Sequence, residues 1–220
     1  MPLVLHKIDG SPPVRAVLMT LDILGLEPTF IEVNTLAGET RTPEFLAKNP
    51  MHTVPLLEDG DFILSDSHAI NTYLVSKYGA EKRENLYSSD FALRATINQR
   101  LYFDAGNLFP KFFAIVVHIL KEGGNGPTPQ HAADIEENYG ILDKYLENSS
   151  FIAGDRLTLA DISIVATVST LDIFVAVTDK FPQLQNWFSR MQETEFYQKA
   201  NAPGLEQIKG YLKMKLEGSA

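Results

Sequence analysis

The chain has 220 residues, 45% of them hydrophobic, a formal net charge of −9 at pH 7 and no cysteine. This composition is typical of a globular protein, and the negative charge argues against nucleic-acid binding because no basic stripe can neutralise phosphates. The lack of cysteine excludes disulfides, thiolate metal sites and redox chemistry by the protein's own thiols. The N-terminal apolar run is too short for a secretory signal, and we expect no membrane span, which favours a cytoplasmic protein.

Residues 1–80 predict one compact module with the element order β-α-β-α-β-β-α. An apolar run at 3–5, a helical stripe at 14–24 and a strand at 30–33 predict a parallel pair with a right-handed crossover. Asp59-Gly60 predicts a two-residue hairpin between the strands that flank it. Pro55 lies in a strand-like run, so it requires an edge, a bulge, a strand start or a cis peptide bond.

Residues 81–90 are polar and predict a linker, and 91–220 predict an all-helical domain. Helices are expected at about 91–121, 129–148, 160–174, 182–192 and 204–216. Thr158 and Asp161 match a capping box, and the helix that follows is almost uncharged on every face, which predicts the buried centre of this domain. Pro110 predicts a kink in the first of these helices.

Three polar positions of the first module fall at the ends of elements, where ligands bind in open α/β sheets. Ser11 precedes Pro12 at a helix start, Asp66-Ser67 begins another helix, and His52 lies in the turn before Pro55. Helix starts offer free N–H groups to anions. Each position also has a structural explanation, since Ser11 and Asp66-Ser67 are favoured caps and a loop histidine is usually solvated. The five histidines show no metal-ligand spacing and no Ser-His-Asp order.

Four motifs occur in the order found in cytosolic glutathione S-transferases, and the chain resembles that family over essentially its whole length. They are Ser11-Pro12-Pro13-Val14-Arg15, Asn49-Pro50-Met51-His52-Thr53-Val54-Pro55, Asp66-Ser67-His68-Ala69-Ile70 and Leu157-Thr158-Leu159-Ala160-Asp161. The pattern is similar to the insect Delta and Epsilon classes, and the third motif favours Epsilon. The resemblance implies a thioredoxin-like N-terminal domain that binds glutathione and an all-helical C-terminal domain that shapes an electrophile pocket.

The resemblance also assigns roles to single residues. Ser11 resembles the catalytic hydroxyl that donates a hydrogen bond to the glutathione sulfur. His52 resembles the contact to the glycine end, and Val54 the position whose main chain pairs with the cysteinyl unit before a cis-Pro55. Asp66 and Ser67 resemble the holders of the γ-glutamyl group. The full set implied to bind glutathione is His52, Thr53, Val54, Pro55, Asp66, Ser67 and His68.

Some positions depart from the family pattern. His68 stands where Delta enzymes commonly have arginine, and Thr40-Arg41 stands where a histidine often helps to bind the glycine end. We expect glutathione to be anchored somewhat more weakly or differently, with function retained.

Helix 91–121 carries more apolar positions than one core-facing stripe needs. The residues expected to line a pocket for a hydrophobic substrate are Leu36, Phe109, Phe113, Val117, Phe174 and Leu205. The alternative is that all of them are core or dimer contacts.

The resemblance implies an enzyme that conjugates glutathione to hydrophobic electrophiles in detoxification. It also implies a homodimer, with glutathione as co-substrate and no metal, nucleic-acid or membrane partner. Two alternatives share the fold: a glutathione-dependent dehydrohalogenase or isomerase, and a non-catalytic carrier of hydrophobic ligands.

Overall fold

The computed structural model describes residues 3–217, and over these residues the first domain has the expected βαβαββα order. Its sheet has the strand order β2-β1-β3-β4, with β1 parallel to β2 and β3 antiparallel to both β1 and β4. This is a thioredoxin-like arrangement. The elements are β1 (Leu3–Lys7), α1 (Pro12–Leu24), β2 (Thr29–Glu32), η1 (Glu39–Arg41), α2 (Pro43–Lys48), β3 (Leu56–Asp59), β4 (Phe62–Ser65) and α3 (Ser67–Tyr78).

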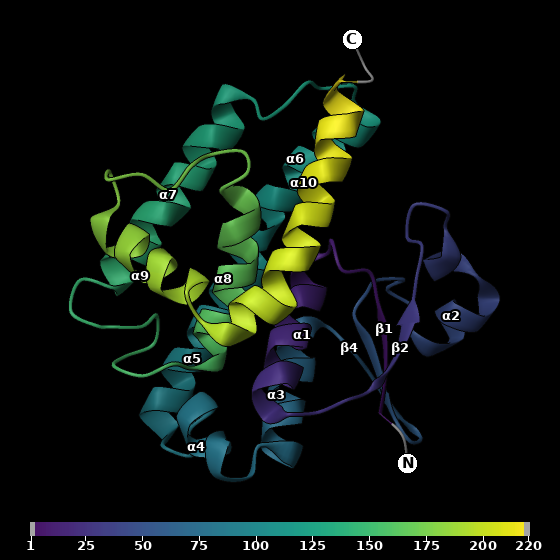
Figure 1. The fold of residues 1–220 in the computed structure, drawn as a ribbon, viewed down its shortest axis with the longest axis vertical. Helices are drawn as coiled ribbons and strands as arrows, with labels where there is room; N and C mark the ends of the chain where they lie inside the picture. The colour runs from purple at the N-terminus through teal and green to yellow at the C-terminus, as the bar shows by residue number, and fades with distance from the viewer. Residues whose placement is uncertain (1–2, 218–220) are drawn as a thin grey trace.

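Helices cover both faces of the sheet. Figure 1 shows α1 and α3 between the sheet and the helical domain, and α2 on the opposite side. Apolar side chains of the strands meet apolar side chains of α1 and α3, and two from strands, two from α1 and two from α3 form a buried cluster. This cluster is Leu5, Val17, Leu21, Leu57, Ile70 and Leu74.

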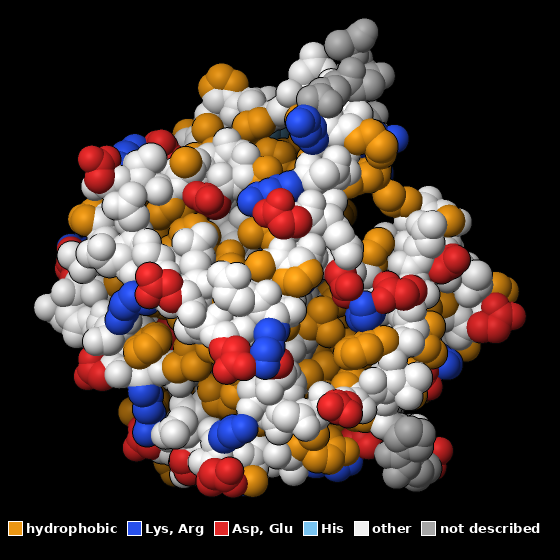
Figure 2. All heavy atoms as spheres, in the orientation of Figure 1, with side chains coloured by type: hydrophobic (Ala, Val, Ile, Leu, Met, Phe, Trp, Pro, Cys, Tyr) orange, Lys and Arg blue, Asp and Glu red, His pale blue; other side chains and the backbone are white. Residues whose placement is uncertain are grey.

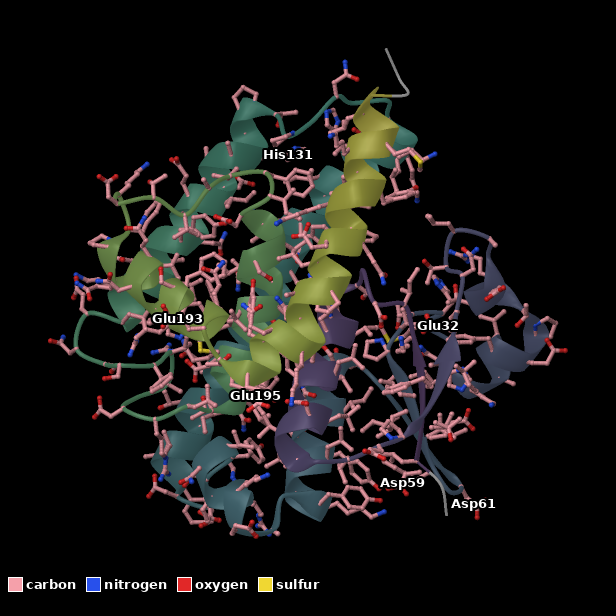
Figure 3. The ribbon with its side chains drawn as sticks, viewed as in Figure 1. Glu32, Asp59, Asp61, His131, Glu193 and Glu195 are labelled. Carbon is pink, nitrogen blue, oxygen red and sulfur yellow. The ribbon has the colours of Figure 1, made fainter. Side chains whose placement is uncertain are left out.

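The β3–β4 hairpin predicted by Asp59-Gly60 is confirmed, and it is fastened to α3. Gly60 has a φ of 64°, the positive value that a tight hairpin turn requires. The Asp59 carboxylate accepts hydrogen bonds from the Lys77 ammonium (2.6 Å) and from the Tyr73 (2.7 Å) and Tyr78 (2.6 Å) hydroxyls. The bond from Lys77, followed by those from the tyrosines, lowers the pKa of Asp59 to about 2. Figure 3 shows Asp59 and Asp61 at the tip of the sheet, away from the helical domain.

The second domain is helical throughout the described residues that follow the sheet, apart from connecting loops and one isolated bridge. Two of its helices are entered through π-helical turns, Asp104–Leu108 before α6 and Tyr197–Asn201 before α10. The main helices are α5 (Phe91–Phe103), α6 (Phe109–Lys121), α7 (Pro129–Tyr145), α8 (Leu159–Leu171), α9 (Pro182–Gln192) and α10 (Ala202–Glu217).

Helix α8 is the predicted centre of this domain, and every one of its residues is buried. The predicted capping box is present: the Asp161 carboxylate accepts from the backbone N–H of Thr158 at 2.9 Å. The same carboxylate accepts from the Trp187 indole N–H at 3.0 Å. One side chain therefore fixes the start of α8 and joins it to α9.

The segment expected to be a polar linker contains short helices. Residues 80–82 form a 3₁₀ turn and α4 spans Arg83–Leu86. Leu86 is 3% exposed and belongs to the core of the helical domain, which explains why this segment orders. The polar composition of 81–90 did not indicate that Leu86 would be buried.

The helical run Phe91–Lys121 bears on the expectation that the chain has no membrane span. Within the described residues it is the one helix long and apolar enough to cross a membrane by length and composition, and a third of its most apolar window is buried. Such a helix is weak support for a membrane span, because the core helix of a globular domain has the same properties. The run is not uniform: a π-turn separates α5 from α6, and Pro110 lies in the first turn of α6, where its missing N–H costs no helix bond.

Candidate active site between the two domains

A cavity of about 270 Å³ opens between the thioredoxin-like domain and the helical domain. Its walls come from the start of α1, the 51–55 loop, the start of α3, the π-turn before α6 and one face of α8. The starts of two helices, α1 and α3, therefore border one cavity, and the partial positive charge of a helix start favours an anionic ligand. The lining residues are Pro12, Pro13, Ala16, Met51, Thr53, Val54, Pro55, Asp66, Ser67, His68, Asp104, Ala105, Phe109, Ser163 and Thr167.

Ser11 occupies the N-cap position of α1, next to the cavity-lining Pro12. Its side chain makes no capping hydrogen bond, so the interpretation of Ser11 as a simple cap does not account for the hydroxyl. The helix is entered instead through the Ser11 carbonyl, which accepts from the Arg15 N–H at 3.0 Å. Ser11 is half-buried and adjoins the cavity through Pro12, but it is not itself one of the lining residues.

The 51–55 loop presents backbone to the cavity. The Val54–Pro55 peptide bond is cis, one of the alternatives expected from the sequence. Among residues 3–217, no protein group is hydrogen-bonded to the backbone N–H or C=O of Val54, whereas the Thr53 carbonyl accepts from the Asn49 amide. Val54 can therefore pair with a ligand backbone. His52 is half-buried, and the cavity wall is formed by its neighbours Met51 and Thr53.

The start of α3 combines a charged cap with a buried hydroxyl. Asp66 is the N-cap, and its Oδ1 accepts from the backbone N–H groups of His68 (2.9 Å) and Ala69 (3.1 Å). Ser67 is 5% exposed and lines the cavity. Asp66 is exposed at the cavity wall, and its capping bonds use only Oδ1. The expected capping role is therefore compatible with a ligand-binding role for Oδ2.

His68 joins the two domains. Its Nε2 lies 2.9 Å from Oδ2 of Asp104, in the π-turn before α6, and its Nδ1 lies 3.5 Å from Oδ1 of Asp66. Burial disfavours a charged imidazole, but the contacts with Asp104 and then Asp66 outweigh it and raise the pKa of His68 to about 10. The imidazole is therefore a cation at neutral pH, and the contact with His68 lowers the pKa of Asp66.

Two polar atoms of the helical domain are buried at the cavity without a hydrogen-bond partner among the described residues. They are Oδ1 of Asp104 and the hydroxyl of Ser163, whose residues are 3% and 1% exposed. Buried polar groups are normally paired, so both atoms suit a polar ligand group. Asp104, Ser163 and Thr167 were not expected from the sequence to belong to the site. The sequence signal for Asp104 is that it is the one charged residue in the largely apolar run 101–109.

The structure places the residues expected to form a hydrophobic pocket in several different environments. Phe109 lines the cavity described above. Leu36 and Phe113 are 63% and 55% exposed, Val117 and Phe174 are half-buried, and Leu205 is buried at 6% exposed. Only Phe109 of this set is brought to the cavity wall. Thr40, at the position where the family often has histidine, is buried at 4% exposed and is absent from the cavity lining.

Within residues 3–217, no group of three or more His, Asp or Glu side chains is arranged to hold a metal ion. The face shown in Figure 2 has Lys and Arg side chains interspersed with Asp and Glu, without a concentrated basic area on that face. The cavity itself is lined by hydroxyls, carboxylates and one imidazole, from Ser67, Ser163, Thr53, Thr167, Asp66, Asp104 and His68.

The fold and the cavity define a two-domain protein whose ligand site lies between a thioredoxin-like domain and a helical domain. The family model for the glutathione S-transferase N-terminal domain matches residues 5–82 of this chain. The family model for the glutathione S-transferase C-terminal domain matches residues 113–195. Glutathione S-transferase 1 of Manduca sexta is 41% identical over 219 residues, which cover 98% of this chain and 100% of the relative.

Solved structures give the same result. An epsilon-class glutathione S-transferase from the housefly Musca domestica is 43% identical with a TM-score of 0.92, over 97% of this chain and 98% of that one. A glutathione transferase homologue from Drosophila mojavensis, with bound glutathione, is 39% identical with a TM-score of 0.92, over 97% of both chains. The chain belongs to the glutathione S-transferase family. The resemblance to the insect Delta and Epsilon classes is confirmed, as is the expectation of a family of enzymes with glutathione as co-substrate.

Proposed function

We propose that this chain is a glutathione transferase in which Ser11 donates a hydrogen bond to the glutathione sulfur and stabilises it as a thiolate. The observation that carries the proposal is the Ser11 hydroxyl, which is placed at the start of α1 but makes no capping bond. The reaction is addition of the thiolate to a hydrophobic electrophile, with departure of the leaving group or protonation of the adduct. The nucleophile belongs to the substrate, consistent with a chain that has no cysteine.

The expected gain follows from the pKa of the thiol. A free thiol has a pKa near ~8.5, and only the thiolate is an effective nucleophile. A hydroxyl donor together with the partial positive charge of a helix start lowers that pKa by about one to two units. At neutral pH the thiolate fraction then rises from a few per cent to roughly half.

The rest of glutathione is assigned to groups that the cavity leaves free. The unpaired backbone of Val54 suits the cysteinyl peptide unit, and the start of α3 with Asp66 and Ser67 suits the γ-glutamyl ammonium and carboxylate. Thr53, Pro55 and His68 complete this set, and His52 is assigned to the glycine end from the adjoining loop. The unpaired oxygen of Asp104 offers a further acceptor to the ammonium group.

We assign residues 1–80 to the glutathione-binding domain, 81–90 to the connection and 91–220 to the domain that selects the electrophile. The electrophile pocket is assigned to Phe109 together with Leu36, Phe113, Val117, Phe174 and Leu205, and the last of these has to move or contribute indirectly because it is buried. The family resemblance supports a cytoplasmic location.

The proposed functional unit is a homodimer. The family resemblance supports this, and helix α5 exposes two large aromatic side chains that a partner could cover, Phe91 at 87% and Tyr102 at 72%. We expect light scattering to give twice the mass of one chain. The mass of one chain at micromolar concentration would contradict the dimer and leave the catalytic assignment intact.

The catalytic assignment is tested with Ser11→Ala and the matched variant Ser11→Thr, which keeps a hydroxyl. We expect Ser11→Ala to lose tenfold or more of kcat/KM toward a chloronitrobenzene at neutral pH, because the thiolate fraction falls from about half to a few per cent. Ser11→Thr should retain more activity than Ser11→Ala. Full activity in Ser11→Ala would show that another group activates the thiol.

A further inference from the structure

Arg15 is a buried cation behind the wall of the cavity. It lies on α1 and is 0% exposed. Helix α1 packs against α8 and against the π-turn Tyr197–Asn201, as Figure 1 shows where the start of α10 crosses α1. The guanidinium reaches across this junction, so a residue of the thioredoxin-like domain ends inside the helical domain.

All hydrogen-bond partners of the Arg15 guanidinium are neutral. Nη1 donates to Oδ1 of Asn201 at 2.6 Å and to the Ser169 hydroxyl at 3.3 Å. Nη2 donates to the Ala166 carbonyl at 3.4 Å and to the Thr170 hydroxyl. Nε has no partner among the residues that the structure describes.

No carboxylate neutralises this charge within residues 3–217, where Arg15 forms no ion pair. Burial lowers the pKa of Arg15 to about 10, opposed by Tyr197 of the π-turn, so the guanidinium is protonated at neutral pH. Asp9, on the turn before α1, is engaged by the Lys7 ammonium at 2.6 Å. Buried charges are normally paired with opposite charges, and an unpaired one is costly.

Arg15 and one of its partners are sequence neighbours of residues that line the cavity. Ala16, which follows Arg15, lines the cavity, and on α8 Thr167 lines it while the preceding Ala166 accepts from Arg15. The N–H of Arg15 donates to the carbonyl of Ser11, so the two residues are one helical turn apart. The low dielectric of a buried junction extends the reach of the charge.

We propose that Arg15 is a positioning residue for the reaction: neutral groups hold its guanidinium in place, so that its unneutralised positive charge favours the glutathione thiolate beside Ser11. The inference rests on the proposed function, since it assumes that the thiolate forms at Ser11. A purely structural role would depend only on the hydrogen bonds of Arg15. The proposed role depends also on its net charge, so a negatively charged partner should weaken the effect on the thiolate.

Asn201→Asp adds a negative charge at the group that holds Nη1, and it also removes the bond that the Asn201 amide N–H donates to the Ser169 hydroxyl at 3.2 Å. A carboxylate at this position can accept the same bond from Nη1 while neutralising the guanidinium. We expect the thiol pKa of glutathione in the enzyme complex, followed by its ultraviolet thiolate absorbance, to rise by about half a unit, which is about a threefold fall in thiolate at a pH below the pKa. The kcat/KM should fall by the same factor at that pH and recover at high pH.

Gln198→Glu is the matched control. It adds the same negative charge to the same π-turn, but on an exposed residue where solvent and salt screen it. We expect its thiol pKa to equal that of the wild type. Arg15→Met is measured in parallel, because it removes the charge without adding another and keeps the test available if Asn201→Asp does not fold.

The outcomes are distinguishable. A raised thiol pKa in folded Asn201→Asp or Arg15→Met, with Gln198→Glu unchanged, supports the inference. A wild-type thiol pKa in either folded variant overturns it and leaves the proposed function standing. Absence of any thiolate band in the wild-type complex would overturn the proposed function itself.

Discussion

His68 and Arg15 are both cations that leave the thioredoxin-like domain and end against the helical domain, yet their surroundings are opposite. His68 meets two carboxylates, those of Asp104 and Asp66, whereas Arg15 meets an amide, two hydroxyls and a carbonyl. In each case a π-turn supplies a contact, Asp104 from one and Asn201 from the other. π-turns are frequently found at functional sites.

This difference in surroundings separates the two charges: that of His68 faces carboxylates within the protein, and that of Arg15 does not. The charge of His68 is matched within the protein, so its contribution is to hold the two domains together at the edge of the cavity. The charge of Arg15 is unmatched, so its field extends to whatever anion binds beside α1. The same interface therefore contains one cation that faces carboxylates and one whose hydrogen-bond partners are all neutral.

The largest expected effect comes from breaking the neutralised contact. Asp104→Ala leaves the His68 imidazole buried beside Asp66 alone, and we expect the free energy of unfolding to fall by about 3–5 kcal/mol. Urea unfolding at neutral pH measures this change. Asp104→Asn, which keeps a hydrogen-bond acceptor, should lose less. An unchanged unfolding midpoint in Asp104→Ala would show that the contact is not stabilising.

The same contact makes the stability depend on pH. The pKa of His68 is raised above its ordinary value of about 6.5, so its contribution to stability is fully present below that pH and is lost as the pH rises through about 10. We expect the free energy of unfolding to fall between these values by at most about 1.4 kcal/mol per pH unit. The difference from His68→Gln over this range isolates the imidazole from other groups that titrate there. Parallel pH profiles for the two proteins would contradict the assignment.

Local chemistry explains what could be predicted from the sequence. Asp59-Gly60 predicts its hairpin, and Thr158 with Asp161 predicts its helix start, because each structure depends on neighbouring residues alone. Ser11, Val54 and Asp66 could be selected because each lies at the end of an element and within a recognised motif.

The remaining features depend on contacts between distant residues. Asp104 acquires its role from His68, 36 positions away, and Arg15 from Asn201, 186 positions away. An amphipathic pattern identifies α6 but not which apolar side chain reaches the cavity, so it predicted Phe109 and Phe113 equally, although Phe113 is 55% exposed. The π-turns also have no local signature in this sequence.

The central claim is that the start of α1 and the Ser11 hydroxyl generate the thiolate. The most direct test is the thiol pKa of bound glutathione, measured from its ultraviolet thiolate absorbance between pH 5 and pH 10, in the wild type and in Ser11→Ala. We predict a wild-type value about one to two units below the free thiol's ~8.5 and a Ser11→Ala value clearly above the wild-type one, although still below that of the free thiol because the helix start and Arg15 remain. Equal values in the two proteins would contradict the account.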